Sequence, residues 1–108
     1  MIDVNEIGEI LTTYKKYGWE LRRVLLTAEL KKNVGELFAE VPLSDSDIDA
    51  AWFSRPPQTG AIAWEIRHLS TSPYALLEHL DEKDGDFEAA LQTVEERLRD
   101  AVAKNRQA

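Results

Sequence analysis

The sequence has no cysteine and few glycines or histidines, and each shortage removes a class of function. Without cysteine, the 108-residue chain has no disulfide, no cysteine-ligated zinc site and no thiol nucleophile. Its five glycines are too far apart for a GxGxxG loop or a P-loop, so the common phosphate cradles are excluded. The two histidines, His68 and His79, fit no metal-ligand spacing. We therefore predict no metal site and no cofactor.

Long apolar runs and an excess of positive charge are also missing. No uninterrupted apolar stretch reaches ten residues, so the sequence predicts neither a transmembrane helix nor a signal peptide. Its 20 acidic and 13 basic residues give a net charge of −7, which opposes binding to phosphate backbones. We expect a cytoplasmic protein with no nucleic-acid or membrane partner. The acidity serves solubility or suits a basic protein partner.

Helical periodicity is present near the start of the chain and in one internal segment. The first apolar stripe comprises Val4, Ile7, Ile10, Leu11, Tyr14 and Tyr17. Asp3 and Glu6 fit a capping box before this stripe, and Gly18 fits a stop after it. Thr27 fits the N-cap of a second helix. The apolar side of that helix would consist of Leu30, Val34, Leu37 and Phe38.

The longest stripe lies at the end of the chain. Asp86 fits its N-cap, and the helix is predicted to extend to near the C-terminus. The stripe comprises Phe87, Ala90, Leu91, Val94, Leu98, Ala101 and Val102. Glu95 and Arg99 are spaced for an i,i+4 ion pair on the solvent side. The stripe suits either the core or a homodimer interface.

Four segments are predicted to be strands. Residues 19–26 are rich in large apolar side chains, and residues 48–53 and 62–67 alternate in polarity around a loop. Residues 74–80 are apolar on both parities, which indicates a strand inside the sheet. If Arg55 pairs with Ala61, Trp52 lies opposite Trp64 and Phe53 opposite Ala63. Residues 42–47 contain Pro42 and a polar run, which predicts a connection.

Together these elements predict a single α+β domain over residues 1–108. Their order is α-β-(α)-β-β-β-α, where the parentheses mark the helix weakened by Gly35. We expect a mostly antiparallel sheet of about four strands with the helices packed on one face.

The sheet face opposite the helices is the candidate ligand- or partner-binding surface. Strand alternation places on this face the residues Phe53, Arg55, Glu65 and Arg67. The two arginines could hold a carboxylate or phosphate through forked hydrogen bonds. One arginine of the first strand, Arg22 or Arg23, could join them. The competing interpretation is a solvent-facing sheet with cross-strand ion pairs.

The absence of catalytic motifs favours a small non-enzymatic protein-interaction module, such as an adaptor, a regulator or a chaperone-like protein. Such a module would bind another protein through an open sheet face, a free edge or its acidic helices. The alternative is a domain that binds a small anion, or an acid–base enzyme in which Glu65 or a histidine moves a proton. We predict no catalytic residue.

Overall fold

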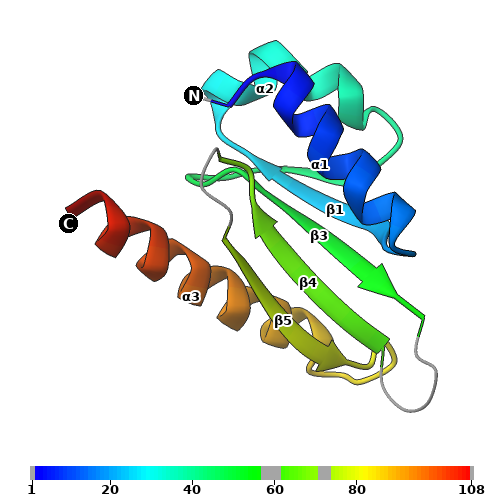
Figure 1. Cartoon of the computed structure of the whole chain (residues 1–108). Helices are drawn as coiled ribbons and strands as arrows, with labels where there is room; N and C mark the ends of the chain where they lie inside the picture. The colour runs from blue at the N-terminus through cyan, green and yellow to red at the C-terminus, as the bar shows by residue number, and fades with distance from the viewer. Residues whose placement is uncertain (1, 57–61, 71–73, 108) are drawn as a thin grey trace.

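The computed structural model describes residues 2–56, 62–70 and 74–107, which form three α-helices, one 3₁₀ helix and five strands. The N-terminal half contains α1 (Val4–Lys16), β1 (Glu20–Leu26), α2 (Ala28–Val34), η1 (Gly35–Phe38) and β2 (Leu43–Asp45). The C-terminal half contains β3 (Ala50–Arg55), β4 (Ile62–His68), β5 (Ala75–Leu80) and α3 (Phe87–Gln107). The predicted α+β class is confirmed, and the elements form one compact domain (Figure 1).

All five strands belong to one mixed sheet in the order β2-β1-β3-β4-β5. The expected four strands were one too few, because β2 forms within the segment predicted to be a connection. This strand has only three residues and pairs in parallel with β1, so it is too short to show an alternating pattern. The other pairs are antiparallel. The segment 74–80 was expected inside the sheet, but β5 is its edge strand.

Local capping explains where the first two helices begin. The side chain of Asp3 accepts a hydrogen bond from the Glu6 backbone N–H at 2.8 Å, as the capping-box prediction requires of its first residue. Thr27 likewise accepts from the backbone N–H of Leu30 at 3.3 Å. Gly18 has a φ of 86°, a left-handed conformation that favours glycine and turns the chain from α1 into β1. These three predicted boundary signals are confirmed.

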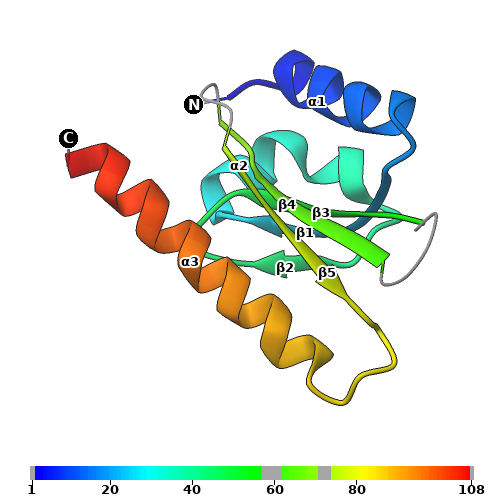
Figure 2. The ribbon, with the colours of Figure 1, turned by 60° about the horizontal axis from the view of Figure 1, so that its bottom comes forward.

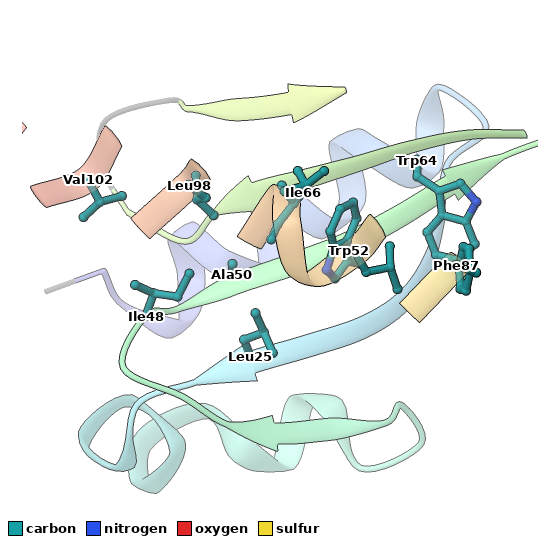
Figure 3. Packing of buried hydrophobic residues seen from close by; sticks show 11 residues of the cluster. Leu25, Ile48, Ala50, Trp52, Trp64, Ile66, Phe87, Leu98 and Val102 are labelled. Carbon is teal, nitrogen blue, oxygen red and sulfur yellow. The ribbon is translucent and has the colours of Figure 1, made fainter. Parts of the chain in front are cut away.

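Helices cover both faces of the sheet, which overturns the expectation of helices on one face. One core lies between the sheet and α3, where Trp52 and Ile66 belong to the same buried cluster as Leu98 (Figure 3). A second core lies between the other face and α1, α2 and η1. Figure 2 shows α1 and α2 on one side of the sheet and α3 on the other. The cause is β3, in which Ala50 to Ser54 are all buried, so both of its faces need cover.

The pairing of β3 with β4 differs from the predicted register by two residues. Arg55 pairs with Ala63, while the predicted partner Ala61 lies outside the described residues. Trp52 is therefore opposite Ile66, and Phe53 is opposite Glu65. A shift of two residues leaves every side chain on its original face, so the prediction of which residues share a face survives the error.

The long C-terminal helix α3 begins directly after Asp86, as predicted, and its apolar stripe is buried against the sheet. The expected pair between Glu95 and Arg99 does not form. Glu95 instead accepts a hydrogen bond from the Trp52 indole nitrogen at 2.8 Å. Arg99 donates to Asp47 at 2.7 Å. Of the helices in the described ranges, none combines the length and the apolar character needed to cross a bilayer.

Candidate functional site

The four residues predicted to form a binding surface all lie on the sheet face that carries α1, so this face is not open over its whole width. Phe53 is buried beneath the helix. The Tyr14 ring stacks on it with a centroid separation of 4.0 Å and an interplanar angle of 17°. Stacked pairs of this kind add to the stability gained from apolar burial. Phe53 therefore anchors α1 to the sheet.

Glu65 lies beside this stack on β4, and its carboxylate accepts a hydrogen bond from the Tyr14 hydroxyl. Burial of the hydroxyl raises the pKa of Tyr14 well above its ordinary value, and the hydrogen bond and negative charge of Glu65 raise it further. The nearby positive charge of Arg67 has the opposite, smaller effect. The hydrogen bond between Tyr14 and Glu65 thus connects α1 to β4, and Tyr14 keeps its proton in it.

Arg67 lines a surface pocket of about 350 Å³ between α1 and the end of β4. The α1 side of this pocket carries Glu6, Glu9 and Thr13. The guanidinium donates a hydrogen bond to the backbone carbonyl of His68, which holds it at this end of the sheet. Two carboxylates and one arginine line this pocket, so its α1 wall is acidic.

Arg55 lies at the opposite end of the same face. Its guanidinium carbon is 4.9 Å from the centre of the Trp19 ring, a cation–π contact. Because Arg67 is opposite Ala51, four positions from Arg55 along β3, the two backbone positions are roughly 13 Å apart. The structure brings Phe53 and Glu65 together through Tyr14, whereas it separates the two arginines. They do not converge on one small ligand.

Neither Arg22 nor Arg23 joins this surface, contrary to expectation. The pairing of β1 with β3 shifts by one residue between Leu21 and Arg23, which marks a β-bulge. Both guanidinium groups consequently lie on the α3 side, Arg22 over the Trp64 ring and Arg23 over the Phe87 ring. The extra residue of a bulge cannot be seen in an alternating pattern, which is why sequence left their facing open.

Tyr14 is the residue of this face that sequence reasoning did not single out. It appeared only as one member of the apolar stripe of the first helix. The available signal was chemical: a tyrosine in a buried stripe carries a hydroxyl that needs a partner. Glu65 supplies that partner from 51 residues away in the sequence.

The uncovered part of this face belongs to the edge strand β5. Ala75, Leu77 and His79 are exposed there, and they pair with Arg67, Glu65 and Ala63 of β4. No family model, curated protein or solved structure matches this chain. The function must therefore be inferred from the structure itself, and two features bear on it: the edge strand β5 and the β-bulge beside Arg22 and Arg23.

Replacing Tyr14 by phenylalanine should reduce the decrease in unfolding free energy that occurs as the pH rises above 10. In the folded state Tyr14 keeps its proton above the ordinary pKa of 10.0. The Tyr14 hydroxyl therefore contributes fully to the free energy of unfolding below pH 10, and this contribution is lost as the pH rises further. Between about pH 8 and about pH 11, wild type should lose about 1 kcal/mol more unfolding free energy than Tyr14→Phe, after allowance for partial exposure. Urea unfolding at both pH values measures this difference. Equal losses in the two proteins would contradict the raised pKa.

Proposed function

We propose that this protein is an interaction module that takes up an extended, basic segment of another protein as a sixth strand beside β5. The observation that carries the proposal is the position of β5: a six-residue strand at the sheet edge with one face exposed. The edge of a sheet presents backbone N–H and C=O groups that an extended chain can pair with.

The two faces of β5 differ in a way that suits such pairing. On the α3 side, Leu76 and Leu80 pack against the core, and Glu78 accepts a hydrogen bond from Arg97 of α3 at 2.9 Å. These contacts hold the strand in place. On the other side Leu77 is 53% exposed. A rigid strand with one exposed leucine offers both a backbone template and an apolar contact for an added strand.

The other edge of the sheet is a poorer template. Its strand β2 has only three residues, and Asp45 at its end forms an ion pair with Lys31 of α2 at 3.0 Å. Short, charged edge strands are the usual protection against unwanted pairing. The difference between the two edges therefore favours β5 as the binding edge.

The negative charge of the chain favours a positively charged partner. The exposed turn that follows β5, residues 81–86, contains four carboxylates and one lysine, and the whole chain carries a net charge of −7. A segment with lysine or arginine near this turn and an apolar residue opposite Leu77 would match both features. A second copy of the chain would instead bring two acidic molecules together. We therefore favour a basic partner over self-pairing through β5.

A selection of displayed random peptides on the full chain tests the proposal, followed by synthesis of the selected peptides. We expect peptides rich in basic and apolar residues that shift the backbone amide resonances of β5. Leu77→Lys should weaken their binding by about tenfold or more, because it removes an apolar contact and adds a like charge. Leu37→Lys is the matched control, since Leu37 is 46% exposed and lies in η1. The control should bind like wild type.

Three outcomes would overturn the proposal. Peptides that shift amides of another element would place the binding site elsewhere, and equal affinity for both lysine variants would remove Leu77 from it. A failure to select any peptide would show that the edge of β5 does not pair with an added strand. The remaining case is a homodimer that pairs through β5, and sedimentation equilibrium of the chain alone detects it. A dimer that Leu77→Lys dissociates would show that a second copy occupies this edge.

A further inference from the structure

A second site lies on the α3 side of the sheet, around the β-bulge of β1 and next to the turn that follows β5. Because the register shifts between Leu21 and Arg23, two consecutive arginines present their guanidinium groups on the same side of the sheet. The Arg22 group lies 4.8 Å from the centre of the Trp64 ring, and the Arg23 group lies 5.7 Å from that of Phe87. Both arginines line a pocket of about 350 Å³ with Trp64 as part of its wall.

The two arginines are not equivalent. Arg23 makes two hydrogen bonds to the carboxylate of Glu88, at 2.8 and 2.5 Å, and the pair lowers the pKa of Glu88. Its guanidinium is therefore committed to tying β1 to α3. Arg22 donates once to the Ser54 hydroxyl at 3.0 Å and once to Glu82 at 2.9 Å. Within the described residues these bonds use two of its five N–H groups.

Trp64 supplies an independent observation. Its side chain is 1% exposed, yet its indole N–H has no hydrogen-bond partner among the described residues. Burying such a donor unpaired costs about 1–3 kcal/mol, so native proteins rarely leave one. Trp52 shows the usual solution, because its indole N–H donates to Glu95 at 2.8 Å. Figure 3 shows the Trp64 nitrogen on the side of its ring that faces away from Trp52.

We propose that this pocket binds a small carboxylate ligand, with Arg22 and the Trp64 indole N–H as the donors. Both side chains line the same pocket, and both donate hydrogen bonds but accept none, so a ligand that meets both would be an oxyanion. The pocket is also lined by Glu20, Glu40 and Glu82, whose charges oppose a dianion more strongly than a singly charged group. This argument selects a carboxylate over a phosphate. A ligand that also carries an ammonium group, such as a free amino acid, would meet these glutamates favourably.

Glu82 acts in this proposal as an internal competitor. Its carboxylate occupies Arg22 in the structure, and it belongs to the exposed turn between β5 and α3. A carboxylate tethered in the same chain has a high effective concentration, so free ligands must be present in excess to displace it. Removing the Glu82 charge should therefore strengthen binding, an effect that a purely structural ion pair would not produce.

The test follows the three indole N–H resonances of the full chain during titrations with acetate, glycine and inorganic phosphate at constant ionic strength. Single tryptophan-to-phenylalanine variants assign the resonances. We expect acetate and glycine to shift the Trp64 resonance saturably in the millimolar range, with the Trp52 resonance unchanged. Arg22→Gln should weaken binding by about tenfold, and Glu82→Gln should strengthen it by about threefold or more.

Arg99→Gln is the matched control, because Arg99 pairs with Asp47 about three turns along α3 from Phe87, the residue that packs on Trp64. It should bind acetate and glycine like wild type. The proposal is overturned if none of the three anions shifts the Trp64 resonance, or if phosphate binds as tightly as acetate. It also fails if Glu82→Gln weakens binding, since that would make Glu82 a support of the site and not its competitor.

Discussion

Replacing Trp52 by alanine should lower the free energy of unfolding by about 3–5 kcal/mol. Trp52 is fully buried between the sheet and α3, and its ring meets that of Trp64 edge to face at 6.3 Å. Alanine would leave a cavity at the centre of this core and would remove the donor to Glu95. Because small domains are stable by only about 5–15 kcal/mol, the variant should unfold at much lower urea concentration and temperature. Urea and thermal unfolding, followed by circular dichroism, measure the loss.

Trp52→Phe separates packing from hydrogen bonding in the same position. Phenylalanine keeps an aromatic ring in the core but cannot donate to Glu95, which is part-exposed and can turn to solvent. We expect a loss of about 1–2 kcal/mol for this variant. If the alanine and phenylalanine variants were equally stable, the Trp52 ring would not fill the core as the structure shows.

Replacing Ile7 by alanine should destabilise the protein by about 2–4 kcal/mol and should loosen α1 selectively. Ile7 is the fully buried residue of α1 and packs into the core on the α1 side of the sheet. Without it, the contacts of Tyr14 with Phe53 and Glu65 would have to hold the helix alone. We expect faster backbone hydrogen exchange in α1 than in α3, measured by mass spectrometry alongside urea unfolding.

Val4→Ala is the control for this prediction. Val4 lies one turn earlier in the same helix and is 43% exposed, so its truncation should change stability by no more than about 0.5 kcal/mol. Equal losses for the two variants would show that burial of Ile7 does not control the docking of α1, since alanine raises helix propensity at both positions. Exchange that accelerates equally in α1 and α3 would show that the two layers unfold as one unit.

Much of the local structure could be predicted from the sequence because short-range chemistry controls it. The caps Asp3 and Thr27 and the left-handed Gly18 act within a few residues of their own positions. The stripe of α3 has a period that only a helix satisfies, and its large members are buried as expected: Phe87, Leu91, Val94, Leu98 and Val102. Alternation also placed Trp52 and Trp64 on one face although the register was wrong.

The candidate binding face was predicted less well, because its environment depends on a helix distant in sequence. Alternation correctly put Phe53 and Glu65 on one side of the sheet, but it contains no information on what covers that side. Tyr14 does so from α1, which closes the part around Phe53 and leaves β5 exposed. The β-bulge beside Arg22 could not be predicted from the sequence either, since one extra residue in a strand changes the side of the sheet to which side chains point without changing the composition.

The α+β class, the principal helices and strands, and the acidic charge follow from the amino-acid sequence, because periodicity, capping and composition are properties of neighbouring residues. The strand order, the division of the helices between two faces, and the partners of Tyr14, Glu95 and Arg22 became clear from the folded structure alone. Each of these depends on contacts between segments far apart in the chain. Their free energy comes from burial and hydrogen bonding that exist only once the layers have packed together.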